Sequence, residues 1–373
     1  MTHRQRIEAV LAAQVPDRIP AIWRLDKWYR ARVHAGDLPA EIAGLSLEQV
    51  EDYLGLARSA RAGRVFRTIL HPPVARTETR QGDTIVTEYH TPAGTLRRVC
   101  RYGPGDEAAG LSPTIVEYPI REPKDYALFG ELMRHTEYVP TYEEFLEYDR
   151  AVGQAGLPMV ILGPNPIHEL LMQWTGYEVG YLHLNDEPET LLSAVRSADD
   201  AYRRFWPIVA DSPARLVMHG VNFDSRMTPP PIFREHFLPY LRSFNDLMHQ
   251  AGKFVACHAD GDMTVLLDLT IEAGFDVADC FACQPLVRCT MAQARAAWRD
   301  RITIWGGLPS TLLEPTVPVA RLIEHLESIY DCLGDGRRFI LGLSDQAMPT
   351  SSWDHLKAAA GFARQRSLRR ERS

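Results

Sequence analysis

Residues 254–281, FVACHADGDMTVLLDLTIEAGFDVADCF, contain two short apolar runs separated by a polar turn and a helical stretch. Short apolar runs that alternate with helical stretches are typical of a parallel sheet whose strands are connected by helices. The same alternation extends in both directions over about residues 158–350, which we expect to be the regular part of an α/β fold. The expected strands are PMVILG (158–163), RLVMHG (215–220), FVACH (254–258), VADCF (277–281), ITIWGG (302–307) and FILGL (339–343).

Each of these strands ends in polar, glycine or cysteine residues. In a closed parallel barrel the carboxyl ends of the strands open on one face, and that face carries the catalytic groups. No glycine-rich phosphate loop follows a strand, so a dinucleotide-binding sheet is the weaker alternative. The sequence therefore predicts a (β/α)8 TIM barrel.

The N-terminal part of the chain predicts additions to this barrel. Residues 4–14 form an amphipathic pattern that Pro16 stops, and PAIWRL (20–25) can form a first short strand. About residues 70–118 contain alternating, β-branched stretches broken by turn residues, which predicts a β-hairpin excursion. No low-complexity linker divides the chain, so residues 1–373 are expected to form a single domain.

Composition and charge exclude several classes of protein. A formal net charge of -7 argues against a nucleic-acid or anionic-membrane surface. No apolar run reaches the ~18 residues that a membrane span needs, and the charged N-terminus does not resemble a signal peptide, so a cytoplasmic protein is expected. Six cysteines in such a chain predict free or metal-bound thiols. The oligomeric state stays open, with a homodimer as one option. A basic run near the C-terminus is expected to be a solvated helix end: Arg364, Arg366, Arg369, Arg370 and Arg372.

The densest group of reactive side chains follows the strand at 254–258. His258 and Asp260 lie two residues apart and share a face on an extended chain. A histidine beside a carboxylate could bind a metal or act as a general-base pair. The alternative is a histidine capped by an aspartate at a helix N-terminus.

Two other strand ends carry polar residues. His219 and Asn222 could contact a substrate, and Asp224, which follows them, could be an acid, a base or a substrate anchor. Its alternative role is to cap the helix that begins near residue 230 or to pair with an arginine. Asp345 follows the last strand, in a place that could also be a tight turn.

The remaining candidates are less specific. Cys280 and Cys283 form a lone C-x-x-C, for which core packing is the favoured interpretation, although Cys283 could be a thiol of the pocket. Asn165 and His168 lie between a strand and a helix, where His168 could simply belong to the first helical turn. Arg24 ends the first strand and could meet an anionic substrate group.

The order of several segments resembles the uroporphyrinogen decarboxylase superfamily over nearly the whole chain. These segments are RIEAVLAAQVPDRIP, TPAGTL, GPNPIHELLMQWTGYE, NFDSRMTPPPIFREHFLPY, AGKFVACHADGD, ITIWGG and FILGLSDQAMP. The resemblance implies a (β/α)8 barrel with a funnel at the carboxyl ends of its strands.

Within that superfamily the chain is more similar to the corrinoid-linked methyltransferases than to the decarboxylases. The decarboxylases use an arginine-rich motif near the N-terminus, where this chain keeps only Arg24. The methyltransferase branch carries a zinc site of one His-x-Cys and a later Cys, and the corresponding places here are His258, Asp260 and Asp345. One imidazole and two carboxylates imply a harder site, for zinc, iron or manganese.

The resemblance implies an O-demethylase type of reaction. A methyl group would move from a small methoxylated aromatic compound to a corrinoid held by a partner protein. His258, Asp260 and Asp345 would hold a metal or a proton, Asn222 and Asp224 would orient the substrate, and an apolar wall would come from Trp305. The chain has no D-x-H-x-x-G corrinoid signature, so the corrinoid would come from the partner.

Two alternatives remain open. The first is a cofactor-free decarboxylase or lyase of a small acid, in which Arg24 binds the carboxylate and Asp224 stabilises a protonated intermediate. The second is a non-catalytic barrel that binds a corrinoid or a partner.

Overall fold

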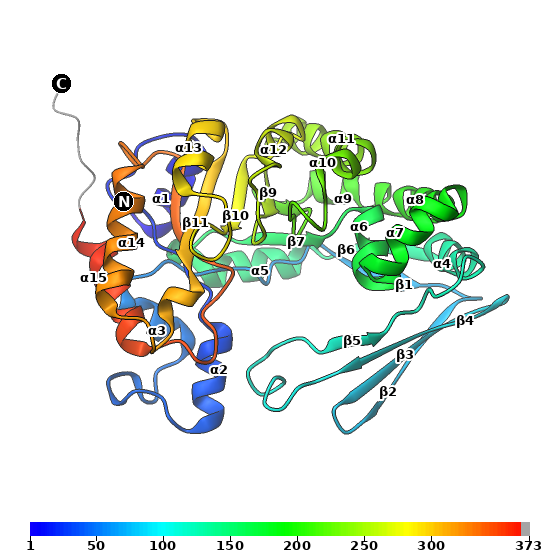
Figure 1. The fold of residues 1–373 in the computed structure, drawn as a ribbon, viewed down its shortest axis with the longest axis horizontal. Helices are drawn as coiled ribbons and strands as arrows, with labels where there is room; N and C mark the ends of the chain where they lie inside the picture. The colour runs from blue at the N-terminus through cyan, green and yellow to red at the C-terminus, as the bar shows by residue number, and fades with distance from the viewer. Residues whose placement is uncertain (367–373) are drawn as a thin grey trace.

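The centre of the protein is a sheet of six parallel strands, in the order β12-β11-β10-β9-β8-β7 (Figure 1). The computed structural model describes residues 1–366, so Arg369, Arg370 and Arg372 of the basic run lie outside the described residues. All six strands coincide with the predicted apolar runs, and β8 to β12 are buried along almost their whole length, as parallel strands usually are, whereas β7 exposes Ile161. Their bounds are β7 Met159–Gly163, β8 Leu216–His219, β9 Phe254–His258, β10 Val277–Phe281, β11 Thr303–Pro309 and β12 Phe339–Ser344.

Two extended N-terminal segments link the outer strands of this sheet. Ala21 forms a parallel bridge to Leu341 of β12, and Ile22 bridges to Ala57. Further along the second segment, Gly63 bridges to Val160 of β7. With the six strands these segments give the eight positions of a (β/α)8 barrel. The first strand expected at 20–25 is thus reduced to single bridges rather than a full ladder.

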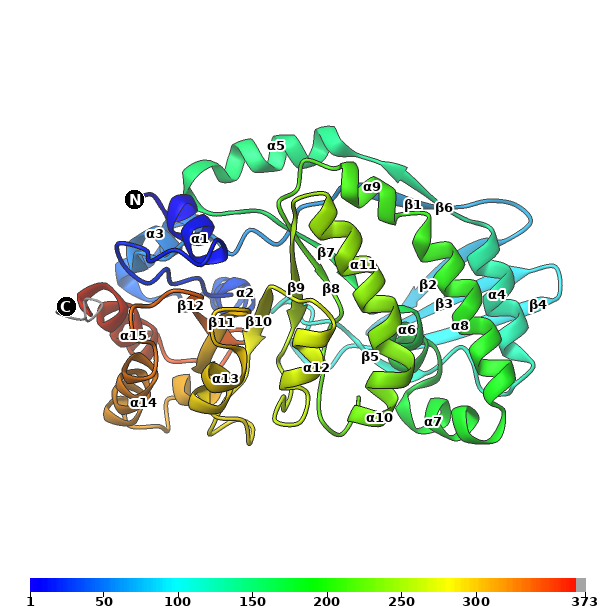
Figure 2. The same ribbon diagram turned by 90° about the horizontal axis from the view of Figure 1, so that it is seen from above.

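Helices cover the outside of the parallel strands, and α8, α11, α12, α13 and α14 follow one another around it (Figure 2). Their apolar faces pack inward, and α14, for example, buries Leu322, Leu326 and Ile329. The barrel helices are α6 Pro166–Glu169, α7 Tyr177–Asp186, α8 Pro188–Arg203, α9 Trp206–Asp211, α10 Pro230–Ile232, α11 Leu238–Gln250, α12 Leu267–Glu272, α13 Met291–Trp298, α14 Val319–Asp331 and α15 Trp353–Gln365. The earlier helices are α1 His3–Leu11, α2 Asp26–Ala35, α3 Leu47–Leu54, α4 Asp125–Arg134 and α5 Tyr142–Val152. Single π-helical turns follow α6 and α10, at Leu170–Thr175 and Phe233–Phe237.

The inside of the barrel has its own apolar core. Side chains from the strands, including Met218, Ala256, Val277 and Ile340, pack together there. The opening helix α1 contributes Ile7, Val10 and Leu11 to the same cluster. The inner core is therefore closed by α1 at one end, and the polar groups described below lie beyond its other end.

The excursion before the regular barrel is larger than the predicted hairpin. It is a four-stranded antiparallel sheet in the order β2-β3-β4-β5, which projects beneath α4 and α7 in Figure 1. Tyr89 and Leu96 on its inner face are buried, whereas every residue of β2 is exposed. A separate antiparallel pair joins β1 to β6. The bounds are β1 Phe66–Leu70, β2 Ala75–Gln81, β3 Thr84–Thr91, β4 Gly94–Arg101, β5 Thr114–Glu117 and β6 Thr136–Pro140.

Within residues 1–366, none of the helices has the length and apolar character that crossing a bilayer requires.

Candidate active site at the carboxyl ends of the strands

A buried histidine and aspartate begin the polar layer above the inner core. His258 ends β9, two residues after Ala256, and Asp279 lies two residues after Val277 on the neighbouring strand β10. The period of two places both polar side chains on the inner face of the barrel. His258 and Asp279 are direct neighbours across the parallel pair, and His258 Nδ1 lies 3.0 Å from Asp279 Oδ2. This bond orients the imidazole and leaves Nε2 for the opening of the barrel.

Cys280 enters the same group because the strand is irregular there. The pairing of β10 with β11 shifts register between Asp279 and Phe281, and Cys280 has a φ of 53°. A left-handed conformation is uncommon for a residue other than glycine and is found preferentially at functional sites. It brings the Cys280 thiol to 3.4 Å from the carbonyl oxygen of Asp345, to which it donates.

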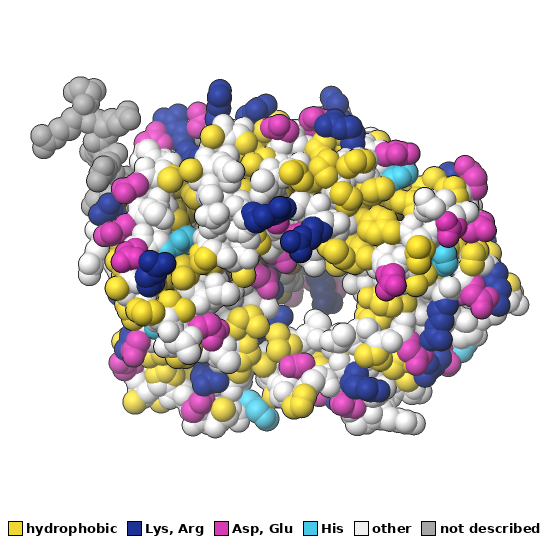
Figure 3. All heavy atoms as spheres, in the orientation of Figure 1, with side chains coloured by type: hydrophobic (Ala, Val, Ile, Leu, Met, Phe, Trp, Pro, Cys, Tyr) yellow, Lys and Arg dark blue, Asp and Glu magenta, His cyan; other side chains and the backbone are white. Residues whose placement is uncertain are grey.

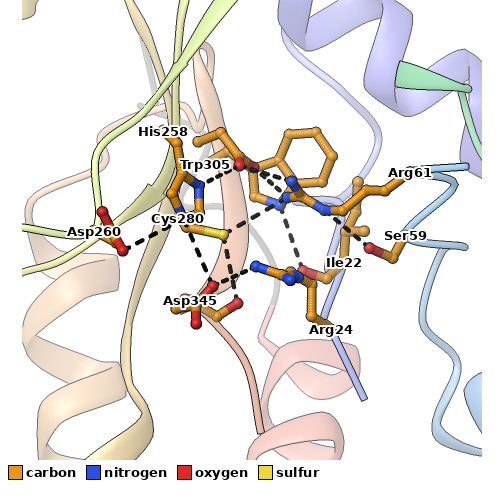
Figure 4. Close-up of polar contacts among 10 residues, drawn as sticks. Ile22, Arg24, Ser59, Arg61, His258, Asp260, Cys280, Trp305 and Asp345 are labelled. Carbon is orange, nitrogen blue, oxygen red and sulfur yellow. Dashed lines mark hydrogen bonds and ion pairs between the residues drawn. The ribbon is translucent and has the colours of Figure 1, made fainter. Parts of the chain in front are cut away.

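Asp345 completes the group from the other side of the barrel. It follows β12 with a φ of 76°, and its carboxylate forms an ion pair with Arg24 (Figure 4). His258 Nε2 lies 3.6 Å from Asp345 Oδ1 and 3.5 Å from Asp260 Oδ2. The structure therefore brings together His258, Asp260 and Asp345, as the sequence predicted, and adds Arg24 to the group.

Arg61 fixes the buried aspartate behind His258. Both of its terminal nitrogens donate to the Asp279 carboxylate, and the bond from Nη1 is 2.8 Å long. Its guanidinium lies 5.1 Å from the centre of the Trp305 ring, within the range of a cation–π interaction (Figure 4). Burial alone would raise the pKa of Asp279, but Arg61 and His258 outweigh it and hold the pKa well below the usual range. Asp279 is therefore a buried carboxylate whose charge is neutralised on two sides.

His258, Cys280 and Asp345 could hold a metal ion. One ligand atom from each lies within 4.8 Å of the others. Imidazole nitrogen, thiolate and carboxylate oxygen are all zinc ligands, and a histidine ligand usually gives its second nitrogen to a carboxylate, as His258 does to Asp279. This donor set fits zinc and includes a thiolate that the sequence-based proposal of His258, Asp260 and Asp345 lacked. Asp260, which the sequence assigned to the metal, lies beside this group at 3.5 Å from His258 Nε2.

Asp224 shapes the rim of the site instead of joining its centre. Its Oδ1 accepts from the backbone N–H groups of Arg226 and Met227, and its Oδ2 accepts from Asp262 N at 2.8 Å. A Cβ added at Gly261 would lie 2.7 Å from the Asp224 Cβ, so the two loops touch. Asp224 thus fixes the turn that follows Asp260. It does not cap the helix that begins near residue 230, because the start of that helix has no side-chain cap. Within residues 1–366, Asp224 makes no direct contact with His258 or Asp345.

Other predicted substrate contacts lie elsewhere. His219 is fully buried and both ring nitrogens are engaged, Nδ1 with Gly163 O at 3.0 Å and Nε2 with the Tyr240 hydroxyl at 2.9 Å. Burial lowers the pKa of His219 to about 4, so it is a neutral core residue. Cys283 is also buried, and burial raises the pKa of its thiol to about 12. The structure therefore corrects the assignment of both residues to the substrate pocket, because neither has a free polar atom exposed to a ligand.

Four further predicted contacts have distinct positions. Trp305 lies in the inner core and donates from Nε1 to Ile22 O at 3.4 Å, so it forms a wall below Arg61. Asn222 is exposed, in a left-handed conformation with a φ of 52°. Asn165 and His168 are fully buried at the carboxyl end of β7.

The group around His258 is open to solvent on one side. The Asp345 side chain is 34% exposed and that of Asp260 is 27% exposed. Figure 3 shows a hollow near the middle of the molecule, with acidic and basic side chains visible at its wall. Arg24 and Arg61 also line a cavity of about 540 Å³ that extends to α3 and α5. A ligand could therefore reach the donor atoms without unfolding the barrel.

Arg61, Asp279 and Cys280 are the site residues that the sequence did not single out. Asp279 had a usable signal, because it is a charged residue inside an otherwise apolar strand. The only sequence signal for Cys280 was its C-x-x-C spacing, which suggests that it pairs with Cys283. Arg61 lies in RSARAG, which has no strand pattern.

Comparison with known proteins agrees with this architecture. A family model described as uroporphyrinogen decarboxylase (URO-D) matches residues 108–366, more than half of the chain. Among solved structures, a methyltransferase from Methanosarcina mazei is similar with a TM-score of 0.58 and 13% identity, over 98% of this chain and 99% of that one. At this identity the similarity concerns the fold. No curated protein matches the sequence. The family expected from the ordered motifs is thus confirmed, and the chain belongs to the uroporphyrinogen decarboxylase family.

Proposed function

We propose that the protein is a methyltransferase that moves a methyl group from a small methyl ether to the cobalt of a corrinoid carried by a partner protein. The observation that carries the proposal is the group of His258, Cys280 and Asp345, with N, S and O donors at the open end of the barrel. The fold shared with a methyltransferase supports it.

The reaction breaks the bond between the methyl carbon and the ether oxygen and forms a bond between that carbon and cobalt. Reduced Co(I) supplies the electron pair of the new bond and becomes Co(III), while the oxygen keeps the electron pair of the old bond. An alkoxide or phenoxide leaves poorly until it is protonated or coordinated. The site must therefore stabilise negative charge on the departing oxygen.

The side chains of this chain have distinct roles in that task. A divalent metal held by His258, Cys280 and Asp345 would supply Lewis acidity next to the ether oxygen. Asp279 keeps the His258 ring in place through Nδ1, and Arg61 balances the charge of that buried carboxylate. Asp260 presents a carboxylate beside the same ring, at 3.5 Å from Nε2, where it can orient the substrate or hold a proton.

Arg24 and Arg61 bear on the choice between methyl transfer and decarboxylation. A decarboxylase of a small acid needs a free cation for the carboxylate of its substrate. Arg24 is paired with Asp345 and Arg61 with Asp279, so a substrate carboxylate would have to displace an aspartate of the protein. This pairing favours methyl transfer.

The test uses zinc-loaded protein, reduced cobalamin both free and bound to a corrinoid protein, and a panel of methoxylated aromatic compounds. We expect absorbance of methylated corrinoid with at least one compound, and bound zinc near one per chain. Cys280→Ser should lower zinc content and methyl transfer together, whereas Cys332→Ser, at an exposed cysteine, should change neither. Absence of methylated corrinoid with every compound, or release of carbon dioxide from a metal-free protein, would overturn the proposal.

A further inference from the structure

His168 lies in an aromatic cage that leaves one of its nitrogens without a partner. The ring is fully buried, with centroids 6.1 Å from Phe223 and 5.1 Å from Phe237. Its Nε2 lies 2.7 Å from the Tyr177 hydroxyl, and its Nδ1 is buried with no hydrogen-bond partner among residues 1–366. Burial lowers the pKa of His168 to about 3, so the ring is neutral and carries one N–H.

The position of that proton decides what the Tyr177 hydroxyl does. A proton on Nδ1 would be a buried donor without an acceptor, which costs about 1–3 kcal/mol, and unpaired buried N–H groups are rarer than unpaired acceptors. The favoured tautomer therefore carries the proton on Nε2 and donates it to the Tyr177 oxygen. The Tyr177 O–H is then free to donate, and it has no other hydrogen-bond partner within residues 1–366.

Tyr177 lies close to the candidate active site. It begins α7, is half-buried, and its ring lies 6.2 Å from that of Tyr181. Burial is the main cause of its raised pKa, and the carboxylates of Asp260 and Asp224 contribute to the increase. Its hydroxyl is thus a permanent hydrogen-bond donor within electrostatic reach of Asp260.

We infer that the Tyr177 hydroxyl forms a donor-only subsite for an acceptor oxygen on the substrate ring, distinct from the methyl ether oxygen. His168 is the positioning residue that turns the Tyr177 hydroxyl toward this oxygen. The substrate class is therefore an aromatic methyl ether with a second oxygen substituent, a hydroxyl or a carboxylate. This inference rests on the proposed function for the identity of the ligand.

The test measures binding by calorimetry with no corrinoid present, so it does not depend on methyl transfer. The probes are anisole, 2-methoxyphenol and 4-methoxybenzoate, of which anisole lacks the second oxygen. Wild-type protein should bind at least one of the other two about five- to tenfold more tightly than anisole, the effect of one hydrogen bond worth about 1 kcal/mol.

Substitutions of Tyr177, Tyr181 and His168 test which side chain causes the binding preference. Tyr177→Phe should remove the preference and leave anisole binding unchanged, while Tyr181→Phe, whose hydroxyl donates to Met227 O, should keep it. His168→Gln, which retains an N–H donor, should keep more of the preference than His168→Leu in proteins of equal thermal stability.

The outcomes distinguish a failure of the subsite inference from a failure of the proposed methyl transfer. Equal binding of all three probes by the wild type, or an unchanged preference in Tyr177→Phe, would overturn the subsite even if methyl transfer is observed. A preference that Tyr177→Phe abolishes would support the subsite even if no corrinoid is methylated.

Discussion

Replacing Asp279 by asparagine tests the buried pair that holds the site together. Asp279 is fully buried, and its carboxylate accepts from two nitrogens of Arg61 and from Nδ1 of His258. Asparagine keeps the shape but removes the charge and turns one acceptor into a donor. The Arg61 guanidinium, whose side chain is only 12% exposed, is then left without its counter-ion.

The size of the effect follows from that burial. Removing one partner of a buried ion pair costs about 3–5 kcal/mol because the other charge remains desolvated. For 373 residues, at about 2.1 cal/mol/K of unfolding entropy per residue, this corresponds to a fall in Tm of about 4–6 °C. Loss of the carboxylate behind a histidine ligand also weakens metal binding by about 10–100-fold.

Calorimetry of metal-free protein gives the stability effect, and zinc titration against a chromophoric chelator gives the affinity. The matched control is Glu107→Gln, because Glu107 also forms a two-pronged pair with Arg80 but both side chains are about half exposed. That change should leave the Tm almost unchanged, because water solvates both groups of an exposed pair. Equal losses of Tm in the two variants, or unchanged zinc affinity in Asp279→Asn, would refute the reasoning.

Three other substitutions test the fold. Burial raises the pKa of Glu51 from 4.5 to about 7 despite its contact with Arg58, so its contribution to stability is present below about pH 4.5 and is lost as the pH rises through 7. Glu51→Gln should therefore gain up to about 3 kcal/mol relative to wild type between pH 5 and pH 8, and parallel Tm profiles would contradict this. Gly306→Ala places a Cβ 2.4 Å from Phe281 N and should destabilise the barrel by several kcal/mol, whereas Gly361→Ala meets nothing within 4 Å on α15 and should stabilise it by about 0.5–1 kcal/mol. Comparable Tm values for the two glycine variants would contradict the close approach of β11 to β10.

The regular barrel could be predicted because most of its strands are buried on both faces. Such strands appear as continuous apolar runs, and FVACH and FILGL match β9 and β12 almost residue for residue. The two N-terminal segments carry no comparable signal, because Ala21, Ile22 and Ala57 make single bridges whose partners are far away in sequence. The size of the antiparallel sheet was underestimated because β2, ARTETRQ, is polar and exposed throughout.

The site was predictable where side chains follow regular strands. His258 and Asp345 were found because the carboxyl ends of parallel strands meet at one face. Cys280 was missed because strict alternation would point it away from Asp279, and only the register shift and the left-handed backbone bring the two together. His219 obeys the alternation equally well but is enclosed by Tyr240 and Gly163, and this enclosure depends on tertiary packing. The roles of the site residues stay predictions.

The neighbouring segments of the barrel wall are joined by unequal numbers of residue pairs, and the site lies where the pairs are fewest. Six consecutive residue pairs join β11 to β12, whereas the segments that carry Arg24 and Arg61 are attached by isolated bridges. Local opening concentrates where a structure is held by few backbone bonds, and amide hydrogen exchange detects it there first. Opening of these segments would separate both cations from Asp345 and Asp279 and would leave the carboxylates to repel each other. Charge balance at this end of the barrel thus depends on segments that are joined by isolated bridges.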